Sequence, residues 1–175
     1  MILLGVAVLL GVPVLLAVPV LAGAFLLVEA GLEHMRAPKA LARAVGTGLT
    51  GARAIAAVEF VVGVPSVAAV LLGTAQLRWA LAGQTVMYVA FTAHLAWRRY
   101  RGDESDCGCN RMGAQVGPGG IARAVFLAVA TLAATVLHPA AALPGGGVAI
   151  LLVACAAVLA ILLYTLPAAV DGRAA

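Results

Sequence analysis

The sequence predicts an all-α protein, an integral membrane bundle of about five helices. Three observations support this. Of the 175 residues, 64% are hydrophobic and 10% are charged, whereas about a quarter of the residues in a typical soluble domain are charged. The mean hydropathy of +1.11 is more apolar than a soluble fold of this size can bury. Five separate apolar runs each approach the roughly 20 residues that a helix needs to cross a bilayer.

The five predicted spans are residues 2–28, 55–72, 77–97, 121–137 and 148–166. The first lacks a basic leading segment and is longer than the roughly 7–15 apolar residues of a signal peptide, so we interpret it as a true span. Between the first two spans, residues 37–51 predict a short surface helix followed by a glycine-rich hinge. The fifth span has almost no polar residues, and its Cys155 is expected to be buried and inert.

Lysine and arginine are divided very unequally between the two ends of the predicted spans. One face, formed by residues 29–53, 98–123 and the C-terminal tail, carries Arg36, Lys39, Arg43, Arg53, Arg98, Arg99, Arg101, Arg111, Arg123 and Arg173. The opposite face carries Arg78 alone. The positive-inside rule therefore predicts a multi-pass protein of a bacterial-type plasma membrane, with the N-terminus outside and the basic face in the cytoplasm. Because these cations mark span ends, we expect no nucleic-acid partner.

The only long polar loop contains Cys107-Gly108-Cys109, on the predicted cytoplasmic side. Two thiols one residue apart can close into a strained disulfide, and strained bridges are the labile, exchangeable kind. The same pair could bind a soft metal such as Cu(I) or have only a structural role. Zinc normally takes four ligands, and the sequence offers no second Cys/His pair, so we predict no metal site.

Glu59 lies inside the second predicted span. A carboxyl group at that depth is costly and is expected to face the bundle interior with a partner. Arg123 and His94 should lie at similar depth and are the candidate partners. The pair could clamp two helices together or handle protons. Glu33, at the end of the first span, is expected to form local ion pairs on a solvated helix end.

No nucleotide, flavin or haem fingerprint occurs, and we predict no cofactor. A quinone held between spans would leave no sequence pattern. In the third span, Gln84, Tyr88 and Thr92 are expected to form hydrogen bonds between helices.

Four motifs together resemble those of the MauE family, small membrane proteins of methylamine utilisation related to DoxX-like four-helix bundles. They are residues 30–38 (Ala-Gly-Leu-Glu-His-Met-Arg-Ala-Pro), a glutamate four residues before a glycine (Glu59, Gly63), the Cys-Gly-Cys loop, and an Ala-Arg pair at residues 122–123. The resemblance covers about residues 20–137. It departs from the family after the cysteines, where Asn-Arg stands in place of the common Phe-Gly.

The resemblance implies a four-helix MauE/DoxX-like unit at residues 1–140, with residues 141–175 adding a further span and a short tail. It also implies an accessory role in maturing methylamine dehydrogenase, whose small subunit is rich in disulfides, together with a thioredoxin-like partner. Cys107 and Cys109 would be the redox pair, accompanied by Glu33, Glu59 and Arg123. Two alternatives remain open: a non-catalytic membrane scaffold, and a small transporter or metal-handling protein.

Overall fold

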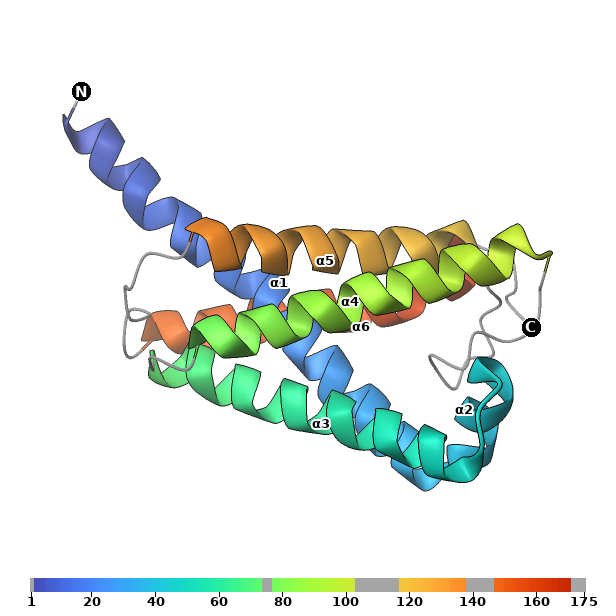
Figure 1. Cartoon of the computed structure of the whole chain (residues 1–175). Helices are drawn as coiled ribbons and strands as arrows, with labels where there is room; N and C mark the ends of the chain where they lie inside the picture. The colour runs from blue at the N-terminus through green and yellow to red at the C-terminus, as the bar shows by residue number, and fades with distance from the viewer. Residues whose placement is uncertain (1, 74–76, 103–116, 138–146, 171–175) are drawn as a thin grey trace.

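A computed structural model describes residues 2–73, 77–102, 117–137 and 147–170, with the side chains of residues 2–15, 168 and 170 left aside. Within these ranges the chain forms six helices and no strand, so the all-α prediction is confirmed (Figure 1). The helices are α1 (Ile2–Arg36), α2 (Pro38–Val45), α3 (Leu49–Leu72), α4 (Leu77–Tyr100), α5 (Pro118–Leu137) and α6 (Gly147–Val170).

Among the described residues, four helices are long and apolar enough to cross a membrane: Leu16–Arg36 of α1, α3, α5 and Gly147–Pro167 of α6. The remaining predicted span, the third along the chain, corresponds to α4, which has 24 residues, about 36 Å at the usual rise, but is less apolar. Some of its polar side chains turn inward, since Gln84 and Arg98 are buried, whereas the apolar Trp79 and Val86 are exposed. The chain is therefore a helical membrane bundle, and membrane crossing by α4 remains a prediction.

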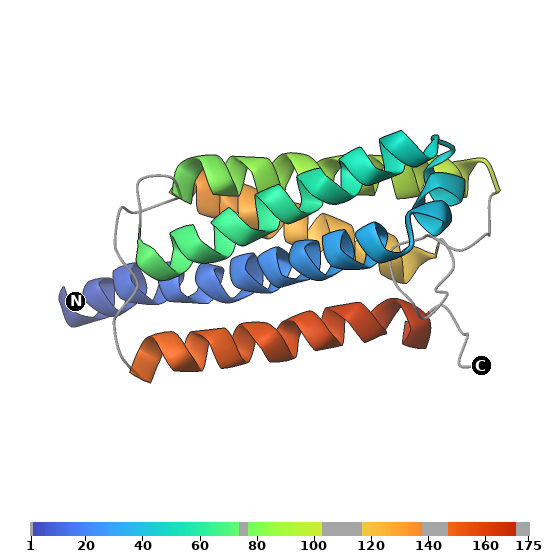
Figure 2. The same cartoon turned by 90° about the horizontal axis from the view of Figure 1, so that it is seen from below.

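Helix α1 runs through the middle of the bundle and packs against α3, α5 and α6, while α4 pairs with α5 (Figure 2). It approaches α3 so closely that no side chain fits between the two backbones. A Cβ atom on Gly63 would lie 2.9 Å from the Val28 nitrogen, and one on Gly31 would lie 2.9 Å from the Phe60 nitrogen. Small residues of this kind allow helices to pack tightly in membranes.

A second link joins α1 to α4 through a buried hydrogen bond. The Tyr88 hydroxyl donates to the Gly23 carbonyl oxygen over 2.7 Å. The interhelical bonding expected for the third span is therefore confirmed for Tyr88 but wrong for its two neighbours. Thr92 bonds within its own helix, to the Tyr88 carbonyl oxygen, and the Gln84 amide has no hydrogen-bond partner among the described residues. The Tyr88 ring also lies 3.1 Å from the site of a Cβ on Gly23, so the small residue again sets the helix spacing.

Replacing Tyr88 with phenylalanine is expected to lower the free energy of unfolding by about 0.5–1.5 kcal/mol, because one interhelical hydrogen bond is lost while the ring packing remains. Denaturant unfolding in detergent measures the change. Tyr100→Phe is the matched control, since that side chain is 90% exposed and should leave stability unchanged. Equal stabilities of Tyr88→Phe and the parent protein would contradict a structural role for the bond.

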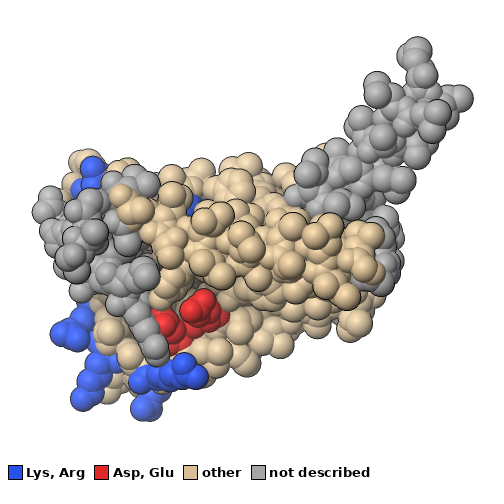
Figure 3. Space-filling model, turned by 180° about the vertical axis from the view of Figure 1, so that it is seen from behind, with Lys and Arg blue, Asp and Glu red and all other residues tan. Residues whose placement is uncertain are grey.

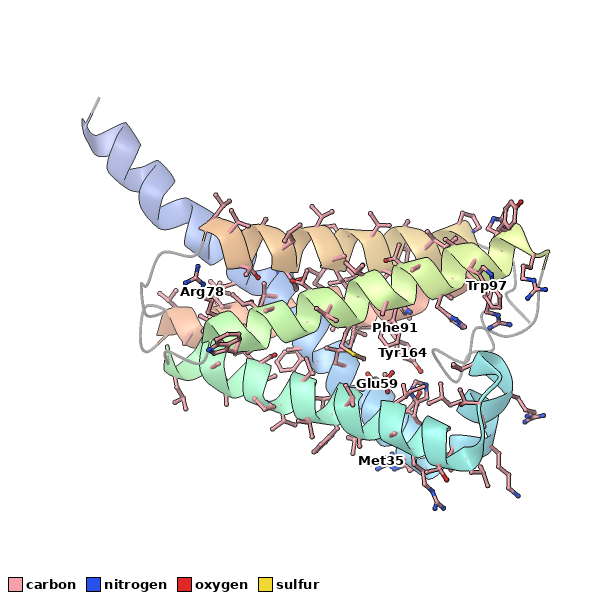
Figure 4. The ribbon with its side chains drawn as sticks, in the orientation of Figure 1. Met35, Glu59, Arg78, Phe91, Trp97 and Tyr164 are labelled. Atoms are coloured by element: carbon pink, nitrogen blue, oxygen red, sulfur yellow. The ribbon has the colours of Figure 1, made fainter. Side chains whose placement is uncertain are left out.

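The charged side chains gather at one end of the bundle. The end of α1, all of α2, the beginning of α3 and the end of α4 meet there, whereas Arg78 lies at the other end (Figures 1 and 4). From behind, the described Lys and Arg side chains lie beside and below the acidic ones at that same end, and most of the remaining surface is uncharged (Figure 3). For the described cations, the fold thus shows the grouping on which the predicted orientation rests, while Arg111 and Arg173 lie outside the described residues. Which side of a membrane this end faces is a separate prediction.

The short helix expected after the first span is α2. It ends at Val45 and is capped by Gly46, whose φ of 71° is a left-handed conformation that glycine adopts without strain. Its buried Leu41 faces the bundle. Helix α2 therefore covers the charged end of the bundle from one side.

Candidate functional site

Beneath α2 the helices line a partly open cavity of about 430 Å³. All six helices contribute to its wall, and most of the wall is apolar, including Leu27, Leu41 and Phe91. Its polar side chains are His34, Glu59, Tyr88, His94, Arg123 and Tyr164. Glu59, Phe91 and Tyr164 come from α3, α4 and α6 and lie near one another in the interior (Figure 4). Mostly apolar walls with a few converging polar groups are typical of small-molecule sites.

Among the ionisable residues that line the cavity, Glu59 is the most deeply buried, with 0% of its surface exposed. Its Oε2 atom shares a hydrogen bond of 2.6 Å with Nδ1 of His34, which is itself 8% exposed. Its other oxygen, Oε1, has no hydrogen-bond partner in the part of the chain that the structure describes. A buried carboxyl group with one satisfied oxygen and one open oxygen is poised to accept a further hydrogen bond.

The close packing of α1 on α3 explains why His34 reaches Glu59. His34 follows Gly31 by one helical turn, and Glu59 precedes Gly63 by one turn, so each lies on the face of its helix that carries the contact glycine. The site of a Cβ on Gly31 is 3.0 Å from the Ala56 carbonyl oxygen. The two glycines thus bring the imidazole and the carboxyl group together.

The sequence analysis predicted Arg123 or His94 as the partner of Glu59, and this prediction was wrong. Arg123 and His94 line the same cavity, but the hydrogen bond is made by His34. Arg123 instead extends from α5 to α6, where its Nη1 donates to the Leu163 carbonyl oxygen over 3.4 Å. The placement of His34 and Gly31 on one helix face, opposite Glu59 and Gly63, is the sequence signal that could have identified the pair.

We expect His34→Phe to lower the free energy of unfolding by about 1–2 kcal/mol, because it keeps a ring of similar size but leaves the buried carboxyl group without its partner. Adding Glu59→Leu to that variant should recover much of the loss, since no unpaired buried polar group then remains. The double-mutant cycle, measured by unfolding in detergent, reports the coupling between the two side chains. Strictly additive effects would contradict the pairing.

The structure brings together three of the predicted site residues, Glu59, His94 and Arg123. Glu33, on α1, does not line the cavity. Cys107 and Cys109 lie outside the described residues. The helices that bracket them, α4 before and α5 after, end and begin at the charged end of the bundle, the end at which the cavity lies (Figure 1).

Cys155 was expected to be buried, and this expectation was wrong. Its side chain is exposed on the outside of α6, among exposed aliphatic residues such as Leu151 and Val158. On the outer surface of a bundle that spans a membrane, such a face contacts lipid. A side chain there is shielded from water without being buried in the protein.

A comparison with models of protein families matches residues 2–137 to the family described as methylamine utilisation protein MauE. The match includes both loop cysteines and every polar residue of the cavity except Tyr164, which α6 contributes from beyond it. No curated protein and no solved structure matches the chain.

Proposed function

The chain belongs to the MauE family, and on that premise we propose that it carries out thiol–disulfide exchange through Cys107 and Cys109. As a family member it is an accessory membrane protein of methylamine utilisation. The finer role proposed here is to exchange disulfides with a thioredoxin-like partner during maturation of methylamine dehydrogenase. The observation that carries the proposal is a pair of thiols separated by a single glycine, within the family match.

The exchange would proceed in two balanced steps. The thiolate of one loop cysteine attacks a disulfide of the partner, forming a mixed disulfide and releasing one partner thiolate. The second loop thiolate then attacks the loop sulfur of the mixed disulfide. This step closes the Cys107–Cys109 bridge and releases the other partner thiolate, so two electrons pass to the partner. The reverse sequence transfers a disulfide to the partner instead.

Glycine between the cysteines supports the proposal. A bridge across one residue closes a small ring, and strained rings favour disulfides that are easily reduced. The glycine gives the backbone the conformational freedom to close such a ring. The helices on either side of the loop end at the same end of the bundle, which would hold the thiols at one membrane face.

For the orientation we propose that this end faces the cytoplasm, following the positive charges. Oxidative maturation of an exported enzyme takes place on the other side of the membrane. Both proposals hold together only if the loop takes electrons from a cytoplasmic thiol donor and passes them across the membrane, whereas a loop on the outer face would act on the exported enzyme directly. Labelling with a membrane-impermeant maleimide distinguishes the two sides: a cytoplasmic loop reacts only after the cells are opened.

The exchange is tested by equilibrating the purified full-length protein in glutathione buffers of different potential and alkylating the free thiols. We expect Cys107 and Cys109 to lose reactivity together, as a two-electron couple with a potential above the roughly −300 mV typical of structural disulfides. The titration is repeated on Cys155→Ser, so that only the two loop thiols are counted. Two loop thiols that react at every potential would overturn the proposal.

A further inference from the structure

The open oxygen of Glu59 constrains what the cavity can bind. The 2.6 Å bond places the shared proton between His34 Nδ1 and Glu59 Oε2. Either arrangement of that proton leaves Oε1 as a hydrogen-bond acceptor. The residue is 0% exposed, and Oε1 has no partner among the described residues. A group that fills the cavity and satisfies this oxygen must therefore carry a hydrogen-bond donor.

Arg123 provides hydrogen-bond donors on the wall of the cavity opposite Glu59. It lies on α5, whereas Glu59 lies on α3, and these helices run on opposite sides of the bundle (Figure 1). A guanidinium group has five N–H donors, and one of the Arg123 donors bonds to the Leu163 carbonyl oxygen. The remaining donors can serve an acceptor in the cavity.

The charges and the apolar wall disfavour strongly ionic ligands. A cationic ligand would meet the fixed positive charge of Arg123, and an anionic ligand would meet the carboxyl group of Glu59. Either would also lose its hydration against an apolar wall that includes Leu27 and Phe91. The best match is a neutral, mostly apolar ring with a donor at one end and an acceptor at the other. The volume of about 430 Å³ is in the usual range for such ligands.

We propose that this cavity binds the ring of a lipid-soluble hydroquinone. One hydroxyl donates to Glu59 Oε1, the para hydroxyl accepts from the Arg123 guanidinium, and the ring packs beside Phe91. Each hydroxyl of a hydroquinone can donate and accept, and the molecule reaches a site of this kind through the bilayer. The proposal rests on the described helices alone, so it stands or falls independently of the exchange proposed for Cys107 and Cys109.

The test uses the full-length protein in lipid nanodiscs, titrated under nitrogen with a decyl-tailed benzohydroquinone. Binding should saturate at one molecule per chain. The bis-methyl ether of the same compound, which has no O–H donor, should bind about tenfold more weakly or worse because it leaves Oε1 unsatisfied. Glu59→Leu should remove that preference, whereas Glu29→Gln, at an exposed position on α1, should preserve it.

The comparison of the two ligands is made on the unchanged protein, so it holds even if Glu59→Leu fails to fold. Equal affinities for the hydroquinone and its ether would overturn the proposal and indicate an apolar space filled by lipid. Tighter binding of decylammonium than of the hydroquinone would overturn it in favour of a cation site. Absence of saturable hydroquinone binding would also overturn it.

Discussion

Replacing both Cys107 and Cys109 with serine is expected to reduce methylamine dehydrogenase maturation to the level of cells that lack the protein. Serine is close in size to cysteine but cannot form a disulfide, so exchange stops while the loop keeps its polarity and length. Uncatalysed disulfide rearrangement takes minutes to hours, too slow to replace a dedicated exchange protein. The measurement is dehydrogenase activity in cells that depend on the variant for growth on methylamine.

Cys155→Ser is the matched control, since that thiol lies on the outer face of α6 and should be dispensable. Immunoblots of isolated membranes establish that both variants accumulate equally. Retained maturation in the double variant would contradict the exchange mechanism. It would favour the scaffold alternative, in which the basic end of the bundle recruits a partner without thiol chemistry.

The second large effect is expected at Gly63, where α3 touches the backbone of α1. The Cβ of Gly63→Val would lie 2.9 Å from the Val28 nitrogen and 3.1 Å from the Ala24 carbonyl oxygen. Because backbone atoms cannot rotate away as a side chain can, the helices must separate. We expect a loss of about 3 kcal/mol in the free energy of unfolding, the upper end of the usual cost of overpacking.

Gly120→Ala is the control for helix glycines in general. The nearest atom to its added Cβ is Leu95 Cδ1 at 3.9 Å, so the change should be neutral or stabilise the protein by up to about 1 kcal/mol. Both variants are compared by denaturant unfolding in the same detergent. A Gly63→Val variant as stable as the parent would show that α1 and α3 are not held at backbone contact.

Much of the fold could be predicted because hydropathy and charge act locally along the chain. Each apolar run became a helix, and the segment after the first run became α2. The inward position of Glu59 also followed from the cost of a carboxyl group in an apolar layer. These features depend on a residue and its near neighbours, which a sequence displays directly.

Other features depend on how helices meet and could not be predicted in this way. The bond between His34 and Glu59 joins residues 25 positions apart and requires the contacts at Gly31 and Gly63. The cavity is lined by all six helices, including Leu41 and Val45 of α2. Cys155 was misplaced because α6 is apolar on all sides, so its sequence does not distinguish the face that contacts lipid from the face that contacts protein.

The most direct test of thiol exchange is to trap the mixed disulfide in cells. Cys107→Ser and Cys109→Ser are expressed separately, the cells are quenched with acid, and free thiols are alkylated before electrophoresis. Removing the resolving cysteine should leave a covalent, reductant-sensitive adduct with a thioredoxin-like protein in one of the two variants. The double variant should form none. Exchange through this pair would be contradicted if the adduct persisted in the double variant. It would also be contradicted if neither single variant formed an adduct.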